Sequence, residues 1–243
     1  MDLTPDSNDR LTEKQLIKLN RRFALIHPDY ILQWAFRMFG TKMVLGTGFG
    51  PSGVFLIHRL STLELPTPVF FLDTHLLFDE THALKEELEE RYDIRIEAVP
   101  PSLGLAEQAA EHGPELWKRD PDKCCHLRKV LPLQNYLSDK TAWISGIRRS
   151  QGDARRRADM FEWDEKNSVI KINPLIHLSA ERVWSDIKKY NLPYNPLHDE
   201  VYPSIGCTPC TSKVNGDEPE RAGRWKELEK TECGIHLPKQ GMS

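Results

Sequence analysis

The fold is decided by the stretch Lys42-Met43-Val44-Leu45-Gly46-Thr47-Gly48-Phe49-Gly50-Pro51-Ser52-Gly53, in a chain of 243 residues. Its first five residues form an apolar run that predicts a buried strand, and the pattern from Val54 to Leu60 predicts a helix. A glycine-rich turn lies between them. Such a strand, turn and helix start form an anion site, because backbone N–H groups and the positive helix end converge on a phosphate.

The glycine-rich turn is open to three interpretations. It is not a Walker A loop, because the Gly-Lys-Ser/Thr ending is missing. Gly48, Gly50 and Gly53 spell G-x-G-x-x-G, and Asp73 follows at the distance that a dinucleotide fingerprint requires, so a Rossmann dehydrogenase stays a rival. A plain tight turn is the third interpretation. Four glycines together with Thr47 and Ser52 favour phosphate binding over a plain turn.

Strand and helix patterns alternate along most of the chain. Apolar runs predict further strands at 69–73, 94–99, 142–147 and 169–173, and amphipathic patterns predict helices at 12–27, 29–39, 78–92, 103–112, 125–137 and 180–190. This alternation predicts an α/β fold with a doubly wound, mostly parallel sheet of about five to six strands. Prolines make the chain loop-rich after residue 192, where a short helix is expected over 220–230.

We expect one structural domain with three parts. Residues 1–40 would form an N-terminal helical segment, residues 41–192 the nucleotide-binding α/β core, and residues 193–243 a C-terminal segment that carries a metal site and a mobile catalytic tail.

Composition excludes several classes of protein. Hydrophobic residues make up 39% and charged residues 28%, which is typical of a soluble globular protein, and a net charge of −3 argues against a general nucleic-acid or membrane-surface binder. No apolar run is long enough to span a bilayer, and the first residues do not resemble a secretory signal. An odd number of cysteines, five, then indicates a reducing cytoplasm. We also expect a homo-oligomer.

The five cysteines divide into four and one. Cys124 and Cys125 are adjacent, Cys207 and Cys210 form a CxxC pair, and Cys233 stands alone. Adjacent thiolates are awkward ligands for one zinc ion, whereas each can find its own iron in a [4Fe–4S] cluster. A cluster held by the first four is therefore the first interpretation, zinc the second, disulfides the third and inert buried cysteines the last.

An arginine-rich segment follows the predicted strand at 142–147. Five arginines fall within the ten residues 148–157, which would lie at the carboxyl edge of the sheet, where open α/β sheets bind ligands. Asp73 would end a strand at the same edge. A solvated charged loop is the alternative, but this position favours an anion such as phosphate or sulfate, which guanidinium groups bind in bidentate fashion.

Cys233 has the surroundings of a reactive thiol. Lys230 and His236 could lower its pKa, and Gly234 permits a mobile arm. The thiolate is the nucleophilic form of cysteine, so a cationic surrounding suits such a role. A thiol that is merely tolerated near a terminus is the alternative.

These residues carry a resemblance to a known family. The chain resembles the assimilatory adenylyl-sulfate reductases, the iron–sulfur branch of the phosphoadenylyl-sulfate reductase family, from about residue 42 to 236. The resemblance rests on the loop at 47–53, Leu72-Asp73-Thr74, Lys123-Cys124-Cys125, Gly146-Ile147-Arg148-Arg149-Ser150-Gln151, Arg221-Ala222-Gly223-Arg224-Trp225 and Lys230-Thr231-Glu232-Cys233-Gly234-Ile235-His236. It implies the PP-loop fold of the adenine nucleotide alpha hydrolases.

The resemblance also implies a reaction and a set of residues. Cys233 would attack the sulfur of adenosine 5′-phosphosulfate (APS), AMP would leave, and thioredoxin or glutaredoxin would release sulfite from the S-sulfonate. Cys124, Cys125, Cys207 and Cys210 would hold a [4Fe–4S] cluster. The implied substrate-binding residues are Thr47, Gly48, Phe49, Gly50, Ser52, Gly53, Leu72, Asp73, Lys123, Gly146, Arg148, Arg149, Gln151, Arg155, Arg224 and His236. Reduction of the 3′-phosphorylated substrate (PAPS), or of both substrates, is the alternative.

Two other classes fit the sequence less well, and one local departure stands out. A PP-loop ATP pyrophosphatase would need a Ser-Gly-Gly loop and a basic RNA surface, and a non-catalytic metal sensor leaves the phosphate loop and the arginines unexplained. After Asp73-Thr74 the family often has Gly-Arg, whereas this chain has His75-Leu76.

Overall fold

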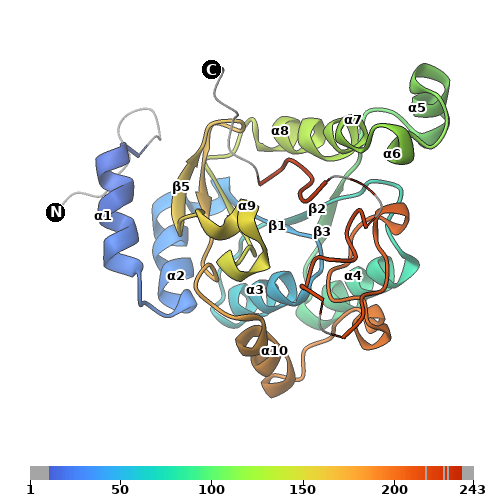
Figure 1. The fold of residues 1–243 in the computed structure, drawn as a ribbon. Coiled ribbons are helices and arrows are strands. Elements are labelled where there is room, and N and C mark those ends of the chain that lie inside the picture. Colours follow the sequence, from blue (N-terminus) through green and yellow to red (C-terminus); the bar gives the residue numbers. More distant parts are fainter. Residues whose placement is uncertain (1–10, 217, 227, 229, 237–243) are drawn as a thin grey trace.

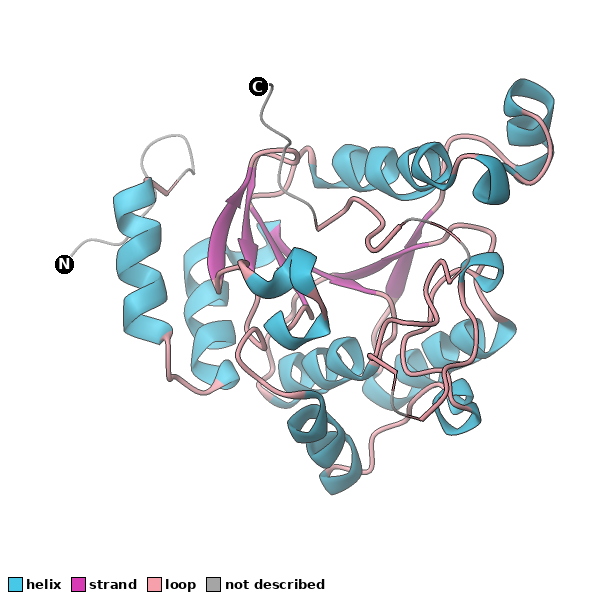
Figure 2. Ribbon diagram, in the orientation of Figure 1, coloured by secondary structure: helices cyan, strands magenta, loops and turns pink. Residues whose placement is uncertain are grey.

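One sheet organises the molecule. The computed structural model describes residues 11–216, 218–226, 228 and 230–236. Within them six strands pair in the order β3-β2-β1-β4-β6-β5. Their bounds are β1 Met43–Thr47, β2 Val69–Leu72, β3 Ile96–Val99, β4 Ala142–Ser145, β5 Phe161–Asp164 and β6 Val169–Ile172. Neighbours are parallel except β5 and β6 (Figures 1 and 2). The predicted mostly parallel α/β sheet of five to six strands is confirmed.

Helices connect the strands and cover both faces of the sheet. Their bounds are α1 Glu13–Phe23, α2 Pro28–Phe39, α3 Pro51–Thr62, α4 Asp79–Tyr92, α5 Leu105–His112, α6 Leu116–Arg119, α7 Pro121–Cys125, α8 Leu131–Leu137, α9 Asp153–Arg156 and α10 Ala180–Lys189. Helix α1 begins with a capping box, in which the Thr12 hydroxyl accepts from the Gln15 N–H and the Gln15 side chain accepts from the Thr12 N–H.

Successive residues of β1 point to opposite faces and so serve two cores. Leu45 and Ile144 lie in the larger core, with buried side chains of α1, α2, α3, α4 and α10. Val44 and Trp143 lie in the smaller core, together with Leu133 of α8. Because both faces of these central strands are buried, they read as continuous apolar runs rather than alternating ones.

The edge where ligands are expected lies beside β1. Strand β1 pairs with β2 on one side and with β4 on the other, so the strand order reverses direction at β1. Open α/β sheets bind ligands outside the carboxyl ends of the strands at such a switch point. The loop-rich C-terminal segment lies near this edge (Figure 1). A bridge between Leu77 and Cys207 ties this segment to the loop that follows β2, and a second bridge, between Thr211 and Arg224, lies within the segment. None of the helices that the structure describes could cross a lipid bilayer.

Three local predictions were wrong. Strand β5 was missed, because its four residues Phe161–Asp164 are only a short edge pairing with β6. The helix expected at 125–137 is broken by a π-helical turn, His126–Val130, that precedes α8. The helix expected at 220–230 is absent from the described residues there: Gly223 packs onto the Ser212 carbonyl, and Trp225 has a φ of +52°.

Candidate active site

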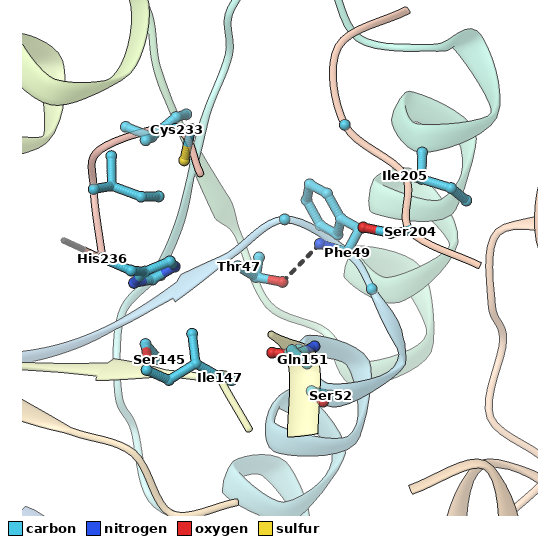
Figure 3. Close-up of a pocket in the computed structure, with 18 of the residues that line it drawn as sticks. Thr47, Phe49, Ser52, Ser145, Ile147, Gln151, Ser204, Ile205, Cys233 and His236 are labelled. Atoms are coloured by element: carbon cyan, nitrogen blue, oxygen red, sulfur yellow. Dashed lines mark hydrogen bonds between the residues drawn. The ribbon is translucent and has the colours of Figure 1, made fainter. Parts of the chain in front are cut away.

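The glycine-rich turn after β1 is held by one hydroxyl and one close packing contact. The Thr47 Oγ1 accepts a hydrogen bond from the Phe49 N–H at 2.9 Å (Figure 3). Helix α3 starts at once, with Gly50 as its N-cap and Pro51 in its first turn. A Cβ on Gly53 would lie 2.3 Å from Thr47 Oγ1, so only glycine lets the helix start approach the loop this closely.

We expect Gly53→Ala to lower the free energy of unfolding by about 1–3 kcal/mol, because the added methyl group overlaps a buried hydroxyl. Gly48→Ala is the matched control: a Cβ there has no neighbour within 4 Å, and its cost should stay within about 0.5 kcal/mol. Urea unfolding of both variants measures the difference. Equal stability of the two would contradict this account of the loop.

A cavity of about 250 Å³ opens above this loop. Figure 3 shows Cys233 and His236 on one side of it, Ser204 and Ile205 on another, and Thr47 and Ser52 at its base. Most of the residues expected to bind substrate line it: Thr47, Gly48, Phe49, Gly50, Ser52, Gly53, Leu72, Gly146, Arg148, Gln151, Arg155, Arg224 and His236, together with Cys233. Residues from four distant parts of the sequence therefore meet at one place.

Three of the expected arginines line the cavity, and two of them, Arg148 and Arg155, are paired with carboxylates. Arg148 is buried, donates to Ser52 Oγ at 3.2 Å and reaches both carboxylate oxygens of Glu220 at 2.9 and 3.0 Å. Arg155 donates to Glu232 at 2.8 Å and to the side-chain Oε1 of Gln151 at 2.6 Å. Such buried guanidinium groups are suited to an anionic ligand.

Three other expected contacts lie elsewhere. Arg149 turns to Asp159 and the Ala158 carbonyl, outside the cavity lining. The Asp73 carboxylate accepts the N–H of His75 at 3.0 Å and does not line the cavity. His75 itself has a φ of +56°, a backbone conformation that favours glycine. This conformation accounts for the glycine that is often found at this position in the family that the chain resembles. Lys123 is exposed on α7.

Cys233 is buried at the cavity rather than exposed on a free arm. The tail around it is held by several contacts. Lys166 Nζ donates to the Gly234 carbonyl at 3.2 Å, and the ring of His236 stacks on Trp143 with centroids 5.7 Å apart. Burial, with the nearby charges of Arg155 and Lys171, holds the pKa of His236 well below its usual range. His236 is thus neutral at pH 7 and adds no positive charge near Cys233.

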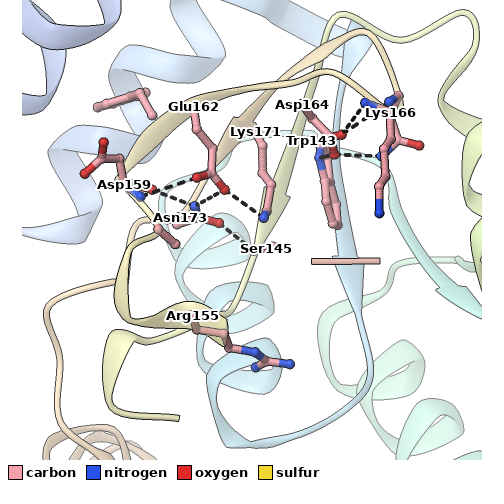
Figure 4. A network of polar contacts seen from close by, with 12 residues as sticks. Trp143, Ser145, Arg155, Asp159, Glu162, Asp164, Lys166, Lys171 and Asn173 are labelled. Carbon is pink, nitrogen blue, oxygen red and sulfur yellow. Dashed lines mark hydrogen bonds and ion pairs between the residues drawn. The ribbon is translucent and has the colours of Figure 1, made fainter. Parts of the chain in front are cut away.

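Strand β5, which the sequence analysis missed, supports the cavity wall from behind (Figure 4). Trp143 Nε1 donates to Asp164 at 3.3 Å. Ser145 Oγ donates to the side-chain Oδ1 of Asn173 at 2.6 Å, and Asn173 Nδ2 donates to Glu162 at 3.2 Å. These bonds hold two cavity-lining side chains, Trp143 and Ser145, in fixed positions.

The other four cysteines meet at a second, smaller cavity. Cys124 and Cys125 from α7 line it together with Cys207 and Cys210, all four are buried, and all five thiols of the chain are free. Thr74 Oγ1 lies 3.2 Å from the Cys207 sulfur. Burial raises the pKa of Cys124 to about 11 and that of Cys125 to about 12.

This donor set fits an iron–sulfur cluster. Metal ions supply the strong positive charge that turns the buried Cys124 and Cys125 thiols into thiolates. Among the described residues no three His, Cys, Asp or Glu side chains are placed to hold one metal ion. A cubane cluster does not need such convergence, because each of its irons takes a single thiolate.

Lys129 was missed by the sequence analysis and lies where Lys123 was expected. It lines both the large cavity and the cysteine cavity. Burial alone would lower the pKa of Lys129, but neighbouring cysteines, Cys207 above all, raise it above its usual range. The signal was its place four residues after Cys125 on a predicted helix, which puts both on one face.

Comparison with known proteins decides the family. Residues 42–213 match the phosphoadenosine phosphosulfate reductase domain. The chain belongs to this reductase family.

Named members of the reductase family match this chain over most of its length. It is 48% identical over 223 residues to the adenosine 5′-phosphosulfate reductase of Salinibacter ruber, covering 91% of this chain and 88% of that protein. It is 47% identical over 213 residues to adenosine 5′-phosphosulfate reductase 2 of Bacillus subtilis, covering 87% and 90%. Among solved structures, the phosphoadenylyl-sulfate reductase of Candida auris in a phosphate complex superposes with a TM-score of 0.74 at 29% identity, covering 84% and 98%.

Proposed function

We propose that this chain reduces APS to sulfite and AMP in sulfate assimilation, with Cys233 as the nucleophile. The Cys233 thiolate attacks the sulfur of APS, a sulfur–sulfur bond forms, and the bond between that sulfur and the bridging oxygen breaks. AMP leaves with the electron pair. The Cys233 S-sulfonate remains on the enzyme.

A dithiol protein of the thioredoxin or glutaredoxin class completes the reaction. One of its thiolates attacks the Cys233 sulfur, sulfite leaves with the sulfur–sulfur electron pair, and a mixed disulfide forms. The second thiolate of the partner resolves that disulfide and restores the Cys233 thiolate. The dithiol thus supplies both electrons and becomes a disulfide.

The convergence of Cys233, the glycine-rich loop and the arginines on one cavity carries this proposal. The loop and Arg148 suit the phosphate, since Arg148 contacts the loop residue Ser52. Leu72 and Phe49 line the same cavity and suit the adenosine. The relatives named adenosine 5′-phosphosulfate reductase support APS as the substrate.

We further propose that Cys124, Cys125, Cys207 and Cys210 hold a [4Fe–4S] cluster. When bound, the cluster supplies a fixed local charge rather than electrons for turnover, because the dithiol supplies both. Lys129 lines both cavities and would lie between the cluster and the substrate, where its charge would act on both. Five free thiols suit a reducing compartment, which supports a cytoplasmic location.

We expect sulfite release from APS with reduced thioredoxin to exceed release from PAPS by at least about tenfold in kcat/KM, a difference of about 1.4 kcal/mol. PAPS reduction stays the alternative because the structurally similar Candida auris protein is a phosphoadenylyl-sulfate reductase. Steady-state assays with both substrates on the same preparation decide between them. A preference for PAPS would reverse the assignment, and no sulfite from either would reject it.

A further inference from the structure

A buried carboxylate stands directly beside the nucleophile. The side chain of Glu232 is 2% exposed, and its Oε2 accepts from Arg155 Nε at 2.8 Å. Its Oε1 accepts from Arg221 at 3.2 Å and from the backbone N–H of Cys233 at 3.0 Å. One carboxylate therefore joins two cavity-lining arginines to the backbone of the attacking residue.

Glu232 suits neither proton transfer nor substrate binding. Burial alone would raise its pKa, but Arg155 and Arg221 overcome that effect and hold the pKa far below its usual range. The carboxylate is therefore ionised throughout the working pH range and has no proton to donate. A negative side chain would also repel an anionic substrate. The role that remains for Glu232 is to hold neighbouring groups in place.

The arginines divide between the two ends of the cavity. Arg148 contacts the glycine-rich loop through Ser52, so it belongs to the phosphate end. Arg155 and Arg221 contact the residue that precedes the thiol, so they belong to the end where the sulfur is attacked. Glu232 neutralises part of the charge at this second end and fixes the direction of both guanidinium groups.

We propose that Glu232 is a positioning residue for the attack by Cys233, because its carboxylate holds Arg155 and Arg221 at the sulfate end of the cavity and ties the Cys233 backbone to them. The inference rests on the proposed function, since it names the residue that aligns the thiol with the bond to be broken. Docking of the segment that carries Cys233 therefore also orients Arg155 and Arg221, because Glu232 contacts all three.

The test is Glu232→Gln in the cluster-loaded enzyme. S-sulfonate formation on Cys233 is followed by intact mass in a single turnover with APS and no thioredoxin, and AMP binding is followed by calorimetry. We expect the single-turnover rate at saturating APS to fall about 100-fold, as displacement of a reacting group does. The Kd for AMP should change less than about threefold, because AMP lacks the sulfate that Arg155 and Arg221 face.

Controls separate positioning from a general loss of structure. Glu200→Gln makes the same change in an exposed ion pair with Lys213 and should leave the rate unchanged. Glu232→Asp keeps the charge with a shorter reach and should recover part of the lost rate. In Arg155→Gln with Glu232→Gln, the two losses should not multiply, because both residues act through one contact.

The outcomes distinguish the possible failures. A wild-type single-turnover rate in Glu232→Gln would overturn the inference, and so would losses that multiply in the double variant. A parallel loss of AMP affinity and of the visible spectrum would assign Glu232 a purely structural role. If Glu232→Gln does not fold, Glu232→Asp carries the test, and a wild-type rate in that variant would overturn the inference. No S-sulfonate in the wild type would reject the proposed function itself.

Discussion

Cys233→Ser is expected to reduce sulfite release from APS to background, a loss on the order of 10⁴–10⁶ in kcat. The reason is that no other described thiol lines the large cavity. Serine is close in size but is a far weaker nucleophile at neutral pH. The measurement is sulfite release with reduced thioredoxin, together with intact mass after incubation with APS. The mass of the variant should not change.

The same variant should keep its iron and its fold. Cys233 does not line the cavity of the other four cysteines, so iron content and the visible spectrum should match those of the wild type. AMP should also bind with unchanged affinity. Sulfite release by Cys233→Ser above a few per cent of wild type would remove Cys233 from the proposed reaction.

Cys210→Ala should have the opposite pattern. The wild type purified without oxygen should hold roughly four irons and four sulfides per chain, and Cys210→Ala should lose most of both, because it removes one of four thiolate ligands. The loop that carries Cys210 should loosen with the metal, since ligand binding and local folding are coupled. Iron and acid-labile sulfide assays measure the first effect, and thermal unfolding measures the second.

Cys233→Ser is the matched control for Cys210→Ala, because it removes one buried thiol of the same chain without touching the cysteine cavity. Zinc without sulfide in the wild type would overturn the cluster proposal and return the four cysteines to a structural zinc site. Unchanged iron in Cys210→Ala would exclude Cys210 as a ligand.

Local sequence was sufficient for the parts of the fold that depend on neighbours along the chain. The run from Met43 to Thr47, the glycine turn and helix α3 were predicted because strand pattern, turn chemistry and helix start are all written within about 20 residues of each other. The Thr12 capping box at the start of α1 is equally local, since Thr12 and Gln15 are three residues apart. Burial of both faces of β1 made its apolar run unambiguous.

Contacts between distant segments were not predictable in this way. The Phe161 backbone of β5 exchanges two hydrogen bonds with Asn20 of α1, and in the described part of 220–230 Gly223 packs onto the Ser212 carbonyl where a helix was expected. Lys129 replaces Lys123 at the cavity because a helix face, not sequence adjacency to the cysteines, decides which side chain reaches it.

By itself, the sequence determined the α/β class, the phosphate loop and the residue types that the chemistry needs. Those depend on local backbone preferences and on the intrinsic reactivity of thiols and guanidinium groups. The tertiary structure decided which arginines face the cavity, that Glu232 pairs with two of them, and that the Cys233 thiol is buried beside them. Those pairings depend on low-dielectric burial of charges from segments far apart in the chain, and only the packed fold creates such an environment.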